Sequence, residues 1–178
     1  MKKIIAFAGS NSRQSINKKL VIFTANQIEN VSVEVLDLND FSMPLYGIDE
    51  EQENGIPQKA HELLNAIHGA DGIILSLAEH NGAYTAAFKN VFDWMSRINS
   101  KVWNNIPMLL MATSPGGRGG SGVLALAKAS FAHMGGNVIA DFSLPDFGQH
   151  FSEEGITDAS LKEKLDTAIA LFSDTVLS

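Results

Sequence analysis

Short apolar runs alternate with helical stripes along the whole chain, and this alternation restricts the possible folds more than any other feature. The apolar runs predict five strands, at residues 2–7, 31–38, 73–77, 106–112 and 138–144. Between and after them, apolar residues recur every three or four positions and predict five helices, at about 15–28, 57–69, 84–95, 123–134 and 157–172. Regular alternation of strand and helix is typical of an α/β fold with a parallel sheet.

The expected architecture is a flavodoxin-like, doubly wound sheet of five parallel strands in the order 2-1-3-4-5. Right-handed crossovers would place the helices on both faces of that sheet. A chain of 178 residues suits a single domain spanning 1–178. Sheets of this kind bind ligands beyond the carboxyl ends of their strands, so the loops after strands 1, 3 and 4 form the candidate site.

The first of these loops joins the first strand to the first helix and is rich in short polar side chains. Its candidate ligand groups belong to Ser10, Ser12, Arg13, Ser15 and Asn17. Unpaired N–H groups and the positive end of the dipole favour an anion at a helix N-terminus. Neither the glycine pattern of dinucleotide loops nor that of Mg-nucleotide loops occurs in this loop. We therefore expect a pocket for one terminal phosphate; the alternative is a turn whose hydroxyls only cap the helix.

The second loop follows the third strand and consists of Ala78, Glu79, His80, Asn81 and Gly82. Its polar side chains would border a ligand, and Gly82 would permit a tight turn. His80 is the best placed of the five histidines, either to stack on a ring or to donate a hydrogen bond to it. No histidine shows the spacing of a metal site, so no metal is expected.

The third loop, residues 113–120, contains four glycines around one arginine. Its expected ligand contacts are Ser114, Gly116, Gly117 and Arg118. Glycines let bare backbone approach a flat ligand and offer it N–H donors. A ring that gains negative charge on reduction would be stabilised by these donors and by the guanidinium. The alternative is a flexible loop ahead of a helix.

Composition excludes several classes of function. The net charge of −7 argues against a general nucleic-acid binder. Without cysteine the chain has no disulfide and no thiolate, which excludes a low-molecular-weight phosphatase. A receiver domain needs an acidic cluster after the first strand and a phosphorylatable aspartate after the third, where this chain has Gly9-Ser10 and Ala78-Glu79. No apolar run reaches the roughly 18 residues of a membrane span, and we expect a cytoplasmic protein with no membrane partner.

The connection from Asn39 to Pro57 is long for a loop and carries an acidic run at 49–53. We interpret that run as solvated surface. Tyr46, within the same connection, is a candidate wall of a ligand cleft.

Large aromatic residues lie beside the helical stripes at Trp94, Trp103 and Phe131. Exposed aromatics of this kind often mark an interface between subunits. The alternative is that all three are buried inside one subunit.

Three segments resemble the motifs of the NADPH-dependent FMN reductase family, which includes quinone, azo-dye and chromate reductases. Residues 9–20 resemble its first motif, usually G-S-x-R-x-x-S-x-N, with Arg13 one position later than usual. Residues 79–82 with 88–94 resemble its second motif, commonly P-E-Y-N-G followed by L-K-N-A-I-D-W. The glycine-rich loop resembles the third.

The resemblance implies a flavodoxin-like protein that binds FMN non-covalently. The phosphate would lie on Ser10, Arg13, Ser15 and Asn17, and the isoalloxazine ring would be bordered by residues 78–82, Gly116 and Gly117. The resemblance also implies a homodimer or a tetramer with the flavin mouth near the interface. Ala78 stands where proline is usual and His80 where tyrosine is usual, which leaves the ring contact and the substrate preference open.

On this reading the chain is an oxidoreductase that passes hydride from NADPH or NADH, through bound FMN, to a small acceptor. The acceptor would be a quinone, an azo compound, an oxyanion or free flavin. The cofactor carries the chemistry, so no acid–base residue is required of the protein. The alternative is an FMN-binding electron carrier with no turnover of its own.

Overall fold

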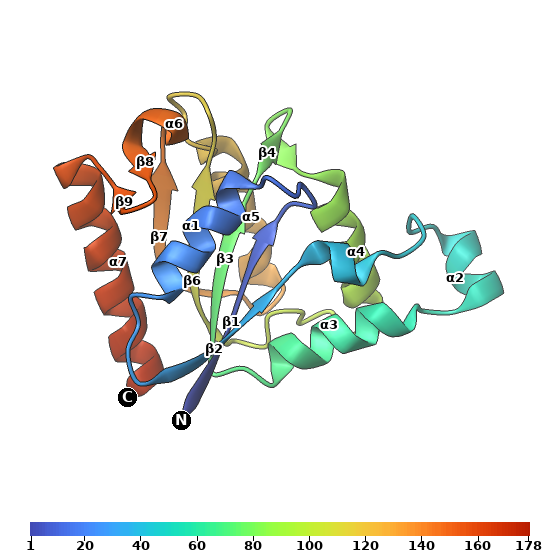
Figure 1. The fold of residues 1–178 in the computed structure, drawn as a ribbon. Helices are drawn as coiled ribbons and strands as arrows, with labels where there is room; N and C mark the ends of the chain where they lie inside the picture. Colours follow the sequence, from blue (N-terminus) through green and yellow to red (C-terminus); the bar gives the residue numbers. More distant parts are fainter.

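Five parallel strands form one sheet in the computed structural model, which describes residues 1–178 (Figure 1). Their order is β2-β1-β3-β6-β7, which confirms the predicted order 2-1-3-4-5. The strands are β1 (Lys2–Gly9), β2 (Val31–Leu36), β3 (Gly72–Leu77), β6 (Pro107–Thr113) and β7 (Asn137–Leu144). Every residue of the central β3 is buried, as its uninterrupted apolar run predicts.

Helices cover both faces of the sheet, as expected (Figure 1). One layer consists of α1 (Ile16–Ala25) and α7 (Ala159–Leu177), and the other of α3 (Gln58–His68), α4 (Ala86–Ile98) and α5 (Ser121–His133). Successive residues of β1 serve the two layers in turn, because side chains alternate across a strand. Ile4 packs with α1 and α7, and Ile5 with α3 and α4. No helix combines the length and apolar content needed to cross a membrane.

Side-chain caps define the starts of the first and last helices. The Ser15 hydroxyl accepts a hydrogen bond from the Lys18 N–H at 3.2 Å, so α1 begins directly after the first loop, as predicted. Asp158 accepts from the Leu161 N–H at 2.8 Å and starts α7 in the same way.

The region after β2 differs from the prediction. β2 ends at Leu36 instead of residue 38, because the Asp37 carboxylate accepts from the Asn39 N–H at 2.9 Å and starts the 3-10 helix η1 (Leu38–Phe41). The acidic run of the long connection forms a short helix, α2 (Ile48–Asn54), which stands away from the sheet (Figure 1).

The second predicted loop is a β-hairpin of β4 (Glu79–His80) and β5 (Ala83–Tyr84). Asn81 and Gly82 at its tip have φ values of 53° and 78°, and positive φ at both central residues is the signature of a type I′ turn. Tyr84 therefore belongs to a strand and not to the next helix, which begins at Ala86. Strands this short give no periodic signal in a sequence.

A further short helix and a hairpin follow β7, and the sequence analysis anticipated neither. They are α6 (Phe147–His150), β8 (Phe151–Ser152) and β9 (Gly155–Ile156). The hairpin lies over α1, where Phe151 and Phe23 stack edge to face with ring centroids 5.5 Å apart.

The aromatic residues near the helical stripes lie inside the subunit. Trp94, Trp103 and Phe131 expose none of their surface, and the rings of Trp103 and Phe131 are 4.4 Å apart between centroids. Of the two alternatives, burial inside the subunit is therefore confirmed, and these residues do not mark an interface.

The outer strand β7 contains one extra residue. Its pairing with β6 shifts between Met108 and Leu109, whose partners are Val138 and Ala140. Ile139 is left without a partner, which is the pattern of a β-bulge.

Candidate functional site

The carboxyl ends of β1, β3 and β6 meet at a hollow of about 260 Å³ that takes walls from all three predicted loops. From the predicted site it includes Ser10, Ser12, Ser15, Asn17, Ala78, Glu79, His80 and Ser114. Three larger hollows lie elsewhere: those of about 540 Å³ and 560 Å³, beside α7 and between α1 and the β8–β9 hairpin, contain no residue of these loops. The third, of about 300 Å³ between η1 and α4, takes only Asn11 from them. The topology thus brings the three loops together at the edge where ligands bind in such folds.

The serine hydroxyls of the first loop are arranged to donate outward. Ser10 accepts from the Ser12 N–H, Ser12 from the Gln14 N–H and Ser15 from the Lys18 N–H, each at 3.2 Å. These bonds fix the loop through the oxygen lone pairs and leave each O–H hydrogen available. The N–H groups of Ile16 and Asn17 meet no backbone acceptor, as expected in the first turn of a helix. The loop therefore offers a ligand hydroxyl and N–H donors, which suits an anion.

Two arginines at the mouth have no carboxylate partner. Arg13 and Arg118 are exposed and form no ion pair, whereas Arg97, the third arginine of the chain, donates to Glu51 at 2.8 Å. Both guanidinium groups are therefore free for an anionic ligand, although neither lines the hollow itself.

Asn17 lies beneath the first loop and is 2% exposed. Its Oδ1 accepts from the Ser76 hydroxyl at 2.7 Å and from the Thr113 N–H at 3.0 Å, while its Nδ2 donates to the Thr113 carbonyl at 3.2 Å. Of the four hydrogen-bonding positions of the amide, one Nδ2 hydrogen remains for a ligand.

This amide explains why the sheet opens at the mouth. The ladder between β3 and β6 ends with the pair Leu77 and Ala112. At the next residue, Thr113, the Asn17 side chain accepts from the main-chain N–H and donates to the carbonyl. It thus replaces the main chain of a neighbouring strand. The chain after β3 is thereby free to leave the sheet and form the β4–β5 hairpin. Sequence reasoning missed Ser76 in this role, although a lone hydroxyl in a fully apolar strand was a signal.

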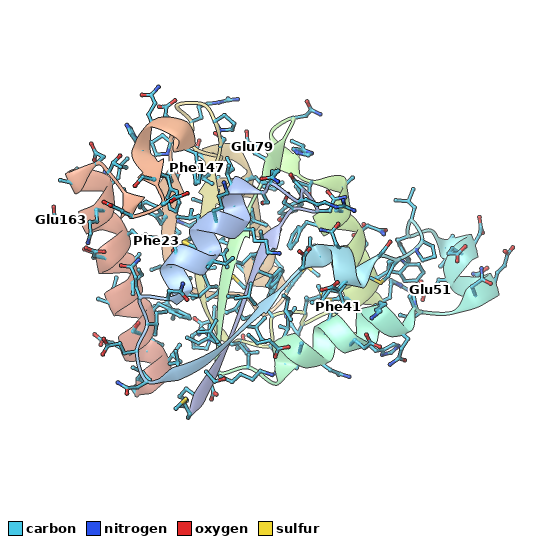
Figure 2. The ribbon with its side chains drawn as sticks, viewed as in Figure 1. Phe23, Phe41, Glu51, Glu79, Phe147 and Glu163 are labelled. Atoms are coloured by element: carbon cyan, nitrogen blue, oxygen red, sulfur yellow. The ribbon has the colours of Figure 1, made fainter.

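Glu79 lines the hollow, but its carboxylate is already hydrogen-bonded within the protein. Its Oε2 accepts from the Val123 N–H, at 2.8 Å, in the first turn of α5. Figure 2 shows Glu79 at the hairpin end of the sheet, far from Glu51 on α2. The side chain thus joins the second loop to the helix that follows the third loop.

The remaining residues of the second loop differ in how they meet the hollow. Ala78 and His80 line it, and His80 is exposed at the hairpin. Asn81 and Gly82 form the turn at the hairpin tip and lie outside the wall.

The third loop is anchored by a segment that the sequence did not reveal. The Asp146 N–H donates to the Gly116 carbonyl and the Phe147 N–H to the Ser114 carbonyl, both at 3.1 Å. Asp146 itself holds a left-handed conformation, with φ 46°. Gly116, Gly117 and Arg118 are exposed at the rim, outside the hollow's wall. Two hydrogen bonds therefore attach the start of the loop to the segment after β7.

Tyr46 does not line the hollow. Its hydroxyl donates to Glu51 at 3.2 Å, and its ring lies edge-on to Trp94 with centroids 5.0 Å apart. Its role as a cleft wall is therefore wrong for this hollow: Tyr46 fastens the segment before α2 to α4.

An ion pair ties the first turn of α1 to the end of β2. Lys18 donates to the Asp37 carboxylate, and this hydrogen bond holds the pKa of Asp37 below its ordinary value. Because Lys18 is engaged there, Arg13 is the cation left free on the first loop.

Comparison with known proteins places the chain in a family. The sequence profile of the NADPH-dependent FMN reductases matches residues 2–149, a stretch that contains all three loops. The chain belongs to the NADPH-dependent FMN reductase family.

Relatives in this family include a quinone reductase of Escherichia coli strain K12, 32% identical over 120 residues. That alignment covers 67% of this chain and 63% of the relative, so it spans less than two thirds of the relative's length. An NADPH azoreductase of Bacillus sp. strain OY1-2 is 28% identical over 137 residues, which are 77% of this chain and 72% of the relative.

Solved structures confirm the fold of this FMN reductase family member. FerB from Paracoccus denitrificans, a flavoenzyme NAD(P)H:(acceptor) oxidoreductase, superposes with a TM-score of 0.78 at 23% identity. The superposition covers 99% of this chain and 98% of FerB. A flavodoxin from Pseudomonas aeruginosa superposes with a TM-score of 0.59 at 9% identity, over 99% of each chain.

Proposed function

We propose that this chain is an FMN-dependent NAD(P)H oxidoreductase that reduces a small acceptor. The observation that carries the proposal is the donor-lined first turn of α1, which opens into a hollow shared by three loops. Flavin mononucleotide has a phosphate, which would lie at that turn, and a flat ring, which would lie across the other two loops. Membership of the FMN reductase family supports the same ligand.

The residues of the first loop fit a phosphate monoester. Ser10, Ser12 and Ser15 would donate through their hydroxyls, Arg13 through its guanidinium, and the first turn of α1 through its free N–H groups. The dianion would also be stabilised by the helix dipole. A metal is not needed to neutralise a single phosphate here, and no cluster of ligating side chains offers a site for one.

The second and third loops fit a flat ring at the rim. Ala78 and His80 would border it on one side and the backbone of Gly116 and Gly117 on the other. Bound FMN supplies the acceptance and donation of hydride. The protein's part is to hold the ring, to leave one face open, and to place N–H donors and Arg118 where negative charge accumulates.

The names of the relatives support small organic acceptors. One is called a quinone reductase and another an NADPH azoreductase. We therefore propose a quinone or an azo compound as the first acceptors to test, with NADPH and NADH compared as reductants.

We also propose that the protein is a homodimer, or a tetramer built from dimers. The hollow of about 260 Å³ is smaller than the roughly 300–1,000 Å³ of most ligand sites, which favours a second copy that completes the site. Leu45 and Ile48 are 81% and 53% exposed on the segment before and within α2. That segment is held rigidly, since Trp94 Nε1 donates to the Pro44 carbonyl at 2.8 Å. A second copy would cover these apolar side chains.

The test is spectroscopic and kinetic. Purified protein should show the visible absorption of bound flavin, retained or restored with FMN, and should oxidise NADPH at 340 nm when a quinone is added. Yellow protein without turnover would favour the electron-carrier alternative. Protein that binds no FMN would contradict the proposal.

A further inference from the structure

The helix after the third loop lacks a capping side chain of its own. Its N-cap is Gly120, which has φ 75° and no side chain to accept a hydrogen bond. Glu79 supplies the missing acceptor from a different part of the chain: its Oε2 accepts from the Val123 N–H at 2.8 Å. A carboxylate at a helix N-terminus is favoured both by the free N–H groups and by the dipole.

Gly122 makes this approach possible. A Cβ atom at position 122 would lie 2.8 Å from Glu79 Oε2 and 3.3 Å from its Cδ. Any larger residue would therefore push the carboxylate away from the helix. Glu79 and Gly122 form a matched pair, although they are far apart in the sequence.

A second contact fastens the same hairpin to the same helix. Tyr84, which pairs with Glu79 across the hairpin, shares a hydrogen bond with the Ser130 hydroxyl at 2.7 Å. Val123 and Ser130 are two turns apart, or about 10 Å along α5. The hairpin is thus held at two points on α5, the helix that follows the glycine-rich loop.

We propose that Glu79 is a positioning residue that fixes the hairpin as the wall of the flavin ring site. It acts through α5, without using its carboxylate on the ligand, and it sets where Ala78 and His80 lie relative to the glycine-rich loop. This inference rests on the proposed function, because it assigns the ring to the space between these two loops. It separates the site into a phosphate half held by α1 and a ring half held by Glu79.

Titrations with FMN and with riboflavin, which lacks the phosphate, test this division. Glu79→Ala should weaken both ligands by the same factor, up to about tenfold, because the lost hydrogen bond to Val123 no longer holds the hairpin in its binding position. Ser15→Ala should weaken FMN and leave riboflavin unchanged. Glu79→Gln keeps an acceptor oxygen of the same reach and should restore most of the affinity. Wild-type affinity of Glu79→Ala for both flavins, or a loss confined to FMN, would overturn the proposal.

The partner glycine gives an independent test. Gly122→Ala should reproduce the loss of flavin affinity in the wild-type background and add nothing in the Glu79→Ala background, because the group it displaces is already gone. Equal effects of Gly122→Ala in both backgrounds would contradict the pairing.

Hydrogen exchange of the flavin-free protein keeps the two proposals distinguishable. Amides of residues 79–84 should exchange faster in Glu79→Ala and in Gly122→Ala than in the wild type, with exchange in β1 and β3 unchanged. Unchanged exchange in the hairpin would show that Glu79 does not hold it. If the wild type bound no flavin while the hairpin exchange rose as expected, the proposed function would fail and the structural role of Glu79 would stand.

Discussion

Arg13 on the first loop and Asn17 in the first turn of α1 lie four positions apart and differ in their surroundings. Arg13 is exposed and makes no ion pair, so its side chain contributes little to the folded state and is free for a ligand. Asn17 is buried, and three of its hydrogen-bonding positions are used within the protein. Removing the first should therefore change binding, and removing the second should change stability.

Arg13→Ala should lower the affinity for FMN about tenfold or more, because a charge-assisted contact to the phosphate is lost. The free energy of unfolding should change by less than about 0.5 kcal/mol, as is usual for an exposed side chain. Flavin fluorescence quenching and urea denaturation measure the two quantities. Lys19→Ala, which removes an exposed cation further along α1, is the matched control and should bind FMN as the wild type does. An equal loss in both variants would show that only the general charge matters.

Asn17→Ala should reduce the free energy of unfolding by about 3 kcal/mol, since it leaves the buried N–H and carbonyl of Thr113 without partners. Ser76→Ala removes one contact of the same network and should cost about 1 kcal/mol. Urea denaturation of both variants checks the order. A cost for Asn17→Ala no larger than that for Ser76→Ala would mean that Thr113 finds another partner.

The residues of the site could be selected from the sequence more easily than their roles. The serines and Arg13 stand in a strand–loop–helix pattern, and local geometry alone places them at a helix N-terminus. Asn17 and Glu79 have the same polar character, but their partners lie 96 and 44 positions away, at Thr113 and Val123. Only the folded sheet brings these groups together, so a single sequence gives no signal for which polar side chain faces the ligand.

At the scale of elements, the pair of Lys18 and Asp37 connects α1 to the end of β2, next to the first loop. The side chains are 34% and 31% exposed, so the pair is partly screened by solvent. Its influence is seen in the pKa of Asp37, which lies below the ordinary value of 3.8 chiefly because of the hydrogen bond from Lys18.

Asp37→Asn should lower the free energy of unfolding by up to about 1 kcal/mol near pH 7. A carboxylate with a depressed pKa in the folded state stabilises the protein above its unfolded pKa, and this contribution is lost as the pH falls through the folded value. The difference between wild type and variant should therefore shrink below about pH 4. Urea denaturation at pH 7, 5 and 3 measures it, and a difference that stayed constant over this range would contradict the assignment.

The long elements were predictable and the short ones were not. Each main strand and helix repeats its apolar pattern over several residues, so its type follows from periodicity. β4 and β5 contain two residues each, and α2 is acidic with no buried residue. None of the three therefore has an apolar pattern that a sequence could reveal. The hairpin exists because Asn81 and Gly82 adopt positive φ between strands that α5 holds in place.

On the scale of the whole molecule, the segment from Pro44 to α2 is the part of the chain that packs least on its own core. Figure 1 shows α2 projecting beyond the end of α3. Contacts with α4 hold it there, including the ion pair of Arg97 with Glu51 at 2.8 Å. Because Leu45 is exposed on this projecting segment, we expect a second copy of the chain to cover it in the proposed dimer.

Leu45→Glu should convert the proposed dimer into monomers, because it places a charge where an apolar side chain would be covered. Size-exclusion chromatography with light scattering should then report the mass of one chain, against two or more in the wild type. Leu171→Glu on α7, where the leucine is 52% exposed, is the control and should keep the wild-type mass. A wild type that is itself monomeric would remove the proposal.

Ile139, the unpaired residue of β7, bears on how this chain behaves at high concentration. A strand on the rim of a sheet offers free backbone groups that can recruit another polypeptide, and an inserted residue disturbs their regular spacing. Asp141, paired with Lys128, adds charge on the same strand. We therefore expect that flank to be a poor template for cross-β growth.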